Sequence, residues 1–310
     1  MSLVDAVIVG VFAVAALLLT WVLWALGGPR LERARFQRVN YRGVTVVTAA
    51  GALAGVSAAA ILVVLRWVAP QELVGDSAGR TSSAVAELVA AHVTTTELLV
   101  GAGLVLFFAL LGLVDDVWAS SSGGGFRGHL RTLRSGRITT GLVKLVAGGV
   151  AALIAAVLLR HNLDPWTQPL VFLSVLPDAA LMALAANTVN LFDRAPLRAW
   201  KAAAFATAVI ALVSAGEPGV VVAVITVFAA GGLLLSEARE RLMQGDAGAN
   251  ALGVSVGVSA VISLSPAGRW ITLGVLLALN LVSEWVSFTT VIDNSRFLRR
   301  LDRWGSPHRS

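Results

Sequence analysis

The sequence predicts an all-α protein: a bundle of about nine membrane-spanning helices forming one integral membrane domain over residues 1–310. Apolar runs of about twenty residues, the length a helix needs to cross a bilayer, recur from residue 3 to about residue 291. Hydrophobic residues make up 57% of the chain and charged residues only 14%, against about 25% in soluble globular proteins. The mean hydropathy is +0.81. The bilayer is therefore the expected solvent for most of the chain.

The expected spans are separated by short segments that are richer in polar residues. They cover residues 3–27, 44–67, 95–115, 138–159, 169–191, 197–215, 218–236, 247–265 and 267–291. The first span is expected to be a membrane helix and not a cleaved signal peptide, because it carries Asp5 in place of a basic start and is too long. Ala, Gly and Val are abundant in the spans, which favours close helix packing in lipid.

The basic residues predict the orientation of these spans. Twenty of the 24 Lys and Arg residues fall in alternate connecting segments, at 30–42, 127–144, 194–201, 239–241 and 296–309. Basic residues accumulate on the cytoplasmic side of a membrane, so the sequence predicts a multi-pass protein of the cell membrane with its N-terminus outside and its C-terminus in the cytoplasm. The net charge of +6 is explained by this topology and does not indicate a nucleic-acid partner.

Polar residues gather at the predicted cytoplasmic ends of four spans. They end the third and fifth spans, begin the eighth, and lie one turn inside the fourth. These residues are Asp115, Asp116, Lys144, Asn187, Asn190, Asp193, Asp246 and Asn250. Because polar groups at the membrane are costly, such residues are candidates for function.

The chemistry of this set favours a hard metal ion and a diphosphate. Carboxylate and amide oxygens suit Mg²⁺ or Mn²⁺, with substrate phosphates completing the coordination shell. The chain has no cysteine and no histidine cluster, which argues against zinc. The segment from Gly245 to Asn250 precedes a predicted helix, whose free N–H groups would favour phosphate. Lys144 and the arginines of 127–137 would offset the charge of a diphosphate.

Each of these patterns also has a structural explanation. Asp115 and Asp116 fit a solvated helix end, and Asn187 and Asn190 fit hydrogen bonds between helices in lipid. The Gly245-Asp246 step is common in turns, and the arginine segments fit topology alone. A functional site is nevertheless predicted, because three separate segments bring acidic and amide residues to one membrane face.

The order of these motifs resembles the polyprenyl-phosphate N-acetylhexosamine-1-phosphate transferases, the family that includes the phospho-MurNAc-pentapeptide translocase. The matching segments are Asn40-Tyr-Arg42-Gly43, Gly112-Leu-Val-Asp115-Asp116, Thr139-Thr-Gly-Leu-Val-Lys144, Asn187-Thr-Val-Asn190-Leu-Phe-Asp193 and Gly245-Asp246-Ala-Gly-Ala-Asn250-Ala-Leu-Gly253. The resemblance covers about residues 30 to 300.

The resemblance implies transfer of a phospho-sugar from a UDP-sugar to a polyprenyl phosphate at the cytoplasmic face, with release of UMP, for cell-envelope glycan synthesis. It implies Mg²⁺ (or Mn²⁺) at Asp246 and Asn190, and a homodimer. Asp115 and Asp116 would position the lipid phosphate or act as base. The implied substrate-binding residues are Asn40, Arg42, Lys144, Asn187, Asp193 and Asn250.

The sequence departs from the family pattern at three places. Family members usually carry Asp-Gly after the Asn-x-x-Asn segment, whereas here Asp193 is followed by Arg194. Ala249 stands where the family usually has a serine. The family's histidine-rich inner loop and tenth helix have no counterpart in this sequence. Because that loop contributes to sugar recognition in the family, the sugar substrate of this chain is expected to differ. A catalytically silent relative that binds the lipid carrier or envelope-assembly partners is the alternative. A transporter is disfavoured, since transporter sites lie near the membrane midplane.

Overall fold

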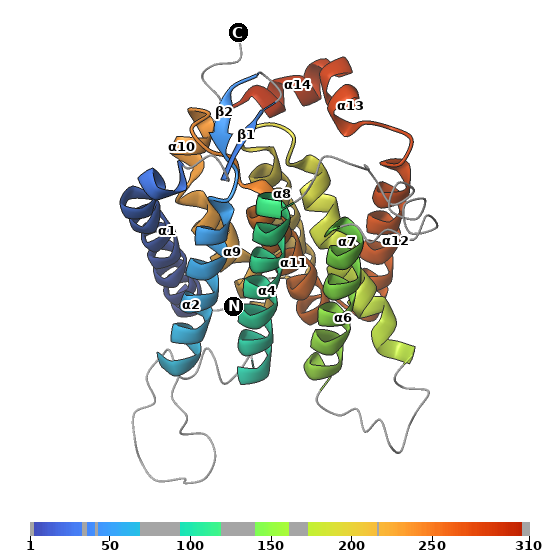
Figure 1. The fold of residues 1–310 in the computed structure, drawn as a ribbon. Helices are drawn as coiled ribbons and strands as arrows, with labels where there is room; N and C mark the ends of the chain where they lie inside the picture. Colours follow the sequence, from blue (N-terminus) through green and yellow to red (C-terminus); the bar gives the residue numbers. More distant parts are fainter. Residues whose placement is uncertain are drawn as a thin grey trace, which may run out of the picture.

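A bundle of helices forms the core of the protein, with their axes roughly side by side (Figure 1). The structure is a computed structural model that describes residues 3–32, 36–40, 43–68, 94–118, 140–160, 173–215 and 217–305. These residues are predominantly helical, which confirms the all-α prediction.

Six helices in the described part of the chain are long and apolar enough to cross a membrane. They are α1 (Leu3–Leu31), α2 (Gly51–Val68), α4 (Thr95–Trp118), α6 (Thr140–Leu159), α7 (Leu176–Phe192) and α11 (Gly245–Ser263). The other three expected spans contain the shorter helices α8 (Arg198–Val213), α9 (Val221–Gly231) and α12 (Pro266–Val282). The count of nine spans therefore stays a prediction.

Short elements cover one end of the bundle (Figure 1). They are β1 (Gln37–Val39), β2 (Thr45–Val47), α10 (Leu234–Ala238), α13 (Phe288–Asn294) and α14 (Arg296–Arg303). A 3₁₀ turn, η3 (Pro218–Val220), leads into α9 at another point of the chain.

The two strands form an antiparallel hairpin that the sequence analysis did not predict. Gln37 pairs with Val47, and the Asn40 side chain accepts a hydrogen bond from Val44 N at 2.9 Å, closing the turn. The expected second span began at residue 44, but β-branched residues at 44–47 favour strand, and the helix begins at Gly51. The expected ninth span also ends early, since α12 stops at Val282.

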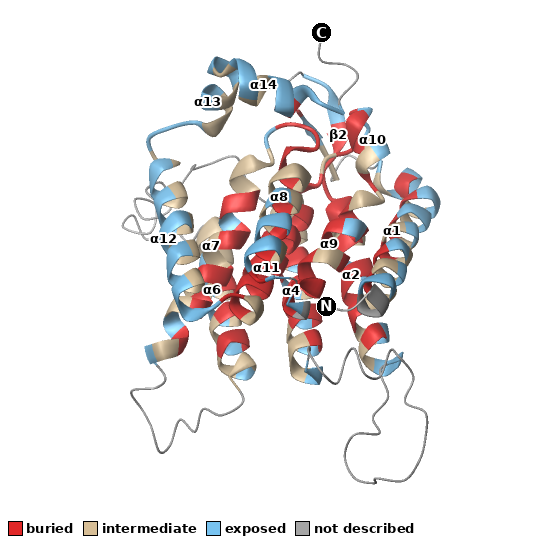
Figure 2. Ribbon diagram, turned by 180° about the vertical axis from the view of Figure 1, so that it is seen from behind, coloured by how far each residue is buried: buried red, intermediate tan, exposed pale blue. Residues whose placement is uncertain are grey.

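Helix α11 is the central helix of the bundle. Almost all of its residues are buried, whereas α1 and α12 expose much of their surface (Figure 2). It packs against α4 and α7 through small residues: a β-carbon at Gly253 would lie 2.5 Å from the Ala185 carbonyl oxygen. A helix end placed at the centre of the bundle can gather side chains from several neighbours.

The C-terminal helices are fastened to the end of the bundle beside Asp193. Arg198, at the start of α8, makes two hydrogen bonds of 2.9 Å to the Asp302 carboxylate of α14, and both side chains are buried. Phe192, at the end of α7, stacks on Phe288 with ring centroids 5.1 Å apart. These contacts hold α13 and α14 over the ends of α7 and α8.

Candidate functional site

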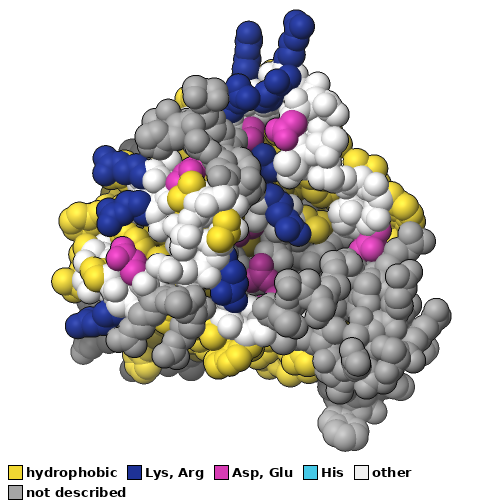
Figure 3. Space-filling model, turned by 45° about the horizontal axis from the view of Figure 1, so that its top comes forward, with side chains coloured by type: hydrophobic (Ala, Val, Ile, Leu, Met, Phe, Trp, Pro, Cys, Tyr) yellow, Lys and Arg dark blue, Asp and Glu magenta, His cyan; other side chains and the backbone are white. Residues whose placement is uncertain are grey.

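Charged side chains of distant segments meet at the end of the bundle covered by the hairpin. The residues Asp115, Asp116, Lys144, Asp193 and Asp246, called the acidic cluster below, come from α4, α6, the end of α7 and the start of α11. Viewed toward this end, acidic side chains lie among Lys and Arg side chains, with hydrophobic side chains mostly around the rim (Figure 3).

Lys144 links the carboxylates of two helices. Its Nζ donates a hydrogen bond to Asp246 Oδ2 and lies 3.4 Å from Asp115 Oδ2. All three side chains are partly shielded from solvent. The structure therefore brings together three of the residues that the sequence analysis assigned to catalysis, substrate and metal.

Asp116 has a different position from Asp115. Its two carboxylate oxygens accept hydrogen bonds from Asp246 N and Ala247 N, each at 3.1 Å, and so cap the first turn of α11. A carboxylate at a helix N-terminus is stabilised by the free N–H groups and the helix dipole. The expectation that these N–H groups are free to bind phosphate was wrong, because both donate to the Asp116 side chain.

Glycines allow the helix ends to come this close. A β-carbon at Gly112 of α4 would overlap the backbone of Asp246 and Ala247, and one at Gly51 of α2 would overlap the backbone near Gly248. Gly245 has φ +65°, a conformation that glycine adopts without strain. Gly112 of the first acidic motif thus packs directly against the backbone of the second motif at the start of α11.

The first expected inner loop reaches the acidic cluster through Arg38. Its Nη2 donates to the Asp116 carbonyl oxygen at 2.8 Å, at the end of α4. Asn40 was predicted to bind substrate, but its side chain accepts a hydrogen bond within the hairpin turn. Arg42 lies outside the described residues. The sequence analysis missed Arg38 because a side chain bonded to a backbone carbonyl leaves no pattern in the sequence.

The remaining predicted site residues of α7 and α11 fall into two groups: some are hydrogen-bonded within the protein, and others have a buried oxygen without a donor. Asn187 donates to Asn280 Oδ1 of α12 at 2.5 Å, so it takes part in a bond between helices. Asn250 donates to the Asp246 carbonyl oxygen at 2.6 Å within α11. In contrast, Oδ1 of Asn190 and Oδ1 of Asp193 are buried and accept no hydrogen bond in the described structure. Buried oxygens without a donor are costly unless a ligand or ion reaches them.

The electrostatic field around Asp193 is strongly negative. Burial raises the pKa of Asp193 well above its usual value, and the nearby carboxylates of Glu237, Asp246 and Asp116 raise it further, while Arg194 opposes them. A cation bound in this region would relieve the repulsion between these carboxylates.

Glu237 of α10 is a buried acid that the sequence analysis did not select. Its Oε1 accepts from Leu197 N and its Oε2 from Gln244 Nε2, both at 3.0 Å. Burial raises its pKa to about 7 despite these hydrogen bonds. The available signal was a lone carboxylate directly after the expected span 218–236.

Protonation of Glu237 predicts a pH-dependent stability. Its pKa is about 7 in the folded state and 4.5 when exposed, so the folded state holds the extra proton between these values. Stability should fall as pH rises through this window, by at most about 1.4 kcal/mol per pH unit for this group. Glu237→Gln should flatten the slope, because glutamine does not titrate. The Gln244 amide can turn and offer its buried, unpartnered Oε1 to the new amide, so the variant should still fold.

Thermal melting in detergent between pH 4.5 and 8 measures this effect. Glu217→Gln, at an exposed position on the chain, serves as the matched control and should follow the wild-type profile. Equal pH slopes for Glu237→Gln and wild type would contradict the prediction.

The donor set fits a metal ion that is shared with a phosphate-bearing substrate. Among the described residues, no group of three or more His, Cys, Asp or Glu side chains is arranged to hold a metal ion on its own. Mg²⁺ commonly binds through one or two carboxylates, with waters and substrate phosphates as its other ligands. The excess of carboxylates and the two unpartnered oxygens of Asn190 and Asp193 agree with that mode.

Comparison with known proteins adds no assignment. No protein-family model matches the chain, and no curated protein matches its sequence.

Proposed function

We propose that the protein is a Mg²⁺-dependent transferase (Mn²⁺ as the other candidate ion) that moves a phospho-sugar from a UDP-sugar to a polyprenyl phosphate and releases UMP. The observation that carries the proposal is the meeting of Lys144 with Asp115 and Asp246, from three helices, at one end of an apolar bundle. A single cation surrounded by several carboxylates suits a diphosphate bound together with a metal ion. The product would serve cell-envelope glycan synthesis.

The proposed topology places this end in the cytoplasm. The described residues of the basic segments, at 30–32, 36–40, 194–201, 239–241 and 296–303, lie toward it (Figure 1), and the positive-inside rule assigns such segments to the cytoplasmic side. In this proposal α8, α9 and α12 complete nine spans in the cell membrane, with the N-terminus outside.

The proposed reaction joins an oxygen of the lipid phosphate to the sugar-bearing phosphorus of the UDP-sugar. The bond from that phosphorus to the UMP oxygen breaks, and the negative charge leaves on UMP. A phosphate monoester has its second pKa at about 6, so the acceptor is already largely ionised near pH 7. The protein's main tasks are then to position the two substrates and to neutralise charge.

Each residue of the acidic cluster has a role in this scheme. Lys144 binds the diphosphate, and Asp115 orients the lipid phosphate. Asp246 and Asn190 would hold Mg²⁺, which would neutralise charge on the diphosphate. Asp193 binds the nucleotide side. Asp116 is a positioning residue, because both of its oxygens hold the first turn of α11.

The other predicted substrate contacts are weaker candidates. Asn187, Asn250 and Asn40 all have hydrogen-bond partners within the protein, so each side chain already has a structural role. The proposed roles of Asp193 in substrate binding and of Asn190 in metal binding are better supported, because each side chain has an oxygen without a donor.

A UMP-release assay tests the proposal. The full chain, purified in detergent, is mixed with undecaprenyl phosphate and a panel of UDP-sugars, in Mg²⁺ or in excess EDTA. We expect UMP from at least one sugar nucleotide, only with both the lipid and the metal present. Absence of UMP with every sugar nucleotide would overturn the transferase assignment.

A silent relative that binds the lipid carrier is the second candidate. The observation in its favour is that Lys144 already neutralises Asp246 through an internal ion pair. This reading predicts binding of polyprenyl phosphate without UMP release, so the same panel and a lipid-binding measurement separate the two.

A further inference from the structure

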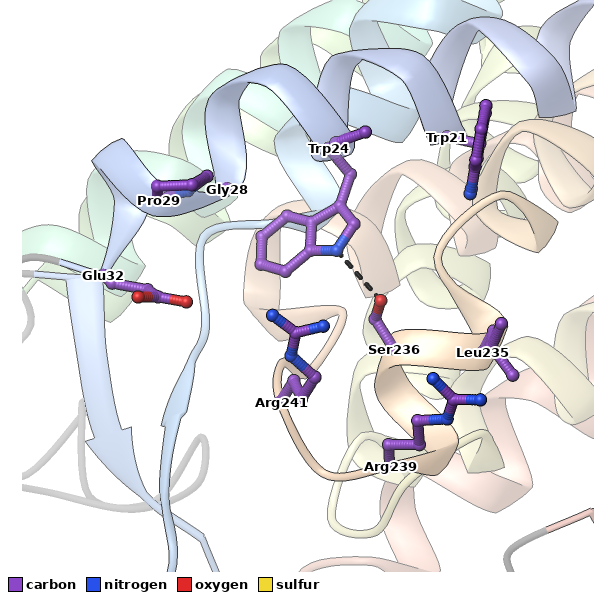
Figure 4. Close-up of a pocket in the computed structure, with 10 residues that line it drawn as sticks. Trp21, Trp24, Gly28, Pro29, Glu32, Leu235, Ser236, Arg239 and Arg241 are labelled. Carbon is purple, nitrogen blue, oxygen red and sulfur yellow. Dashed lines mark hydrogen bonds between the residues drawn. The ribbon is translucent and has the colours of Figure 1, made fainter.

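A pocket lies away from the acidic cluster, between the end of α1 and α10. Its volume is about 300 Å³, and its walls include Trp21, Trp24, Glu32, Arg239 and Arg241 (Figure 4). No residue of the acidic cluster lines it. Both sites lie toward the end of the bundle that carries the hairpin (Figure 1).

The backbone fixes the two arginines of the pocket. Glu240 between them has φ +53°, and Arg241 N donates to the Ser236 carbonyl oxygen at 3.0 Å. The Arg241 carbonyl oxygen accepts from Val47 N of β2 at 3.3 Å. The turn that carries both guanidinium groups is therefore held on two sides.

The pocket is lined by two basic side chains and one acidic side chain, so its formal charge is positive. The side chains of Arg239 and Arg241 make no hydrogen bond or ion pair with any part of the described chain. Glu32 is the one acidic residue among the lining residues, and it forms no ion pair with either arginine. Two guanidinium groups in one pocket favour a phosphate, which each can bind through paired hydrogen bonds.

The opposite wall is aromatic and leads to an apolar surface. Trp24 is buried and donates from Nε1 to Ser236 Oγ at 2.9 Å (Figure 4). Trp21 is 53% exposed and continues, at helical spacing, an exposed stripe along α1. The stripe consists of Val7, Val11, Val14 and Leu18. Tryptophan is enriched at the boundary between lipid headgroups and acyl chains.

We propose that this pocket binds the phosphate headgroup of an anionic phospholipid, with an acyl chain lying along the α1 stripe. The two arginines bind the phosphate, and Trp21 marks the depth at which the headgroup ends and the hydrocarbon begins. The apolar stripe next to the pocket favours a lipid phosphate over a free one. This site is separate from the proposed transferase site and does not depend on its activity.

Native mass spectrometry of the full chain in neutral detergent tests the proposal with three probes: phosphatidylglycerol, phosphatidylcholine and inorganic phosphate. Arg239→Gln combined with Arg241→Gln should weaken phosphatidylglycerol binding at least about tenfold, because the charge-assisted hydrogen bonds to the phosphate are lost. Arg296→Gln combined with Arg300→Gln makes the same charge change on the exposed part of α14. This control should stay within about twofold of wild type.

The remaining outcomes are equally decisive. An unchanged affinity in the pocket variant, or an equal loss in the control, would overturn the proposal. Inorganic phosphate that binds as well as phosphatidylglycerol would identify a free-anion site instead. Should the Gln variant melt early, Arg239→Lys with Arg241→Lys keeps the charge but loses the paired hydrogen bonds, and an intermediate loss is then expected.

Discussion

Replacement of Asp246 by asparagine should reduce UMP release by about a thousandfold or more without unfolding the protein. The substitution keeps the side-chain volume, and it keeps the backbone N–H that donates a hydrogen bond to Asp116. It removes the negative charge of a carboxylate that pairs with Lys144 and that we propose as a metal ligand. Losing one electrostatic contact at a reacting centre commonly costs about 10²–10³ in rate, and a metal ligand is expected to reach the upper end of that range.

Asp293→Asn is the control for this experiment. Asp293 is an exposed carboxylate on α13, at the same end of the bundle, and its removal should leave the rate within about twofold of wild type. Raising the Mg²⁺ concentration should recover part of the Asp246→Asn activity if metal affinity is what fell. An Asp246→Asn enzyme as fast as wild type would remove Asp246 from the site.

Gly112→Ala should destabilise the protein by about 3 kcal/mol, the upper part of the usual range for overpacking. The added β-carbon would overlap the backbone of Asp246 and Ala247, which cannot move aside as a flexible side chain can. The first turn of α11 would have to shift, so the hydrogen bonds to Asp116 and the Lys144–Asp246 pair should weaken together. Activity should fall along with stability.

Gly103→Ala on the same helix is the matched control. A β-carbon at Gly103 meets no atom within 4 Å, so this change should leave stability unchanged or slightly raised. Because the entropy of unfolding is about 2.1 cal/mol/K per residue, the Gly112 variant of this 310-residue chain should melt roughly 5 °C lower in detergent. Equal melting temperatures for the two alanine variants would contradict the close approach of α4 and α11.

The apolar runs of the sequence were sufficient to place the helices. Each of the nine expected segments contains a helix, because a run of about twenty apolar residues has few other stable states in lipid. Lengths were less predictable. The run at 44–67 contains a strand at its start, since Thr45, Val46 and Val47 pair with the backbone of β1, a contact distant from the local pattern.

The candidate site was predicted in its composition but not in its internal bonding. The polar residues at 115, 144 and 246 were expected at one face, and the structure joins them. The cap formed by Asp116, the buried Glu237 and the link from Arg38 all depend on backbone groups that only the folded chain brings near. Adjacent aspartates look alike in a sequence, although their oxygens face different partners.

Asp115 contacts Lys144 whereas Asp116 caps α11, and this difference affects how related sequences are interpreted. If the proposed function holds, a relative that has lost catalysis could change the first aspartate, whereas the second would still be needed to start the central helix. A retained second aspartate would then report an intact fold, and only the first would report a working site. Related chains with an altered first aspartate and an intact second would be the natural candidates for lipid-binding proteins without transferase activity.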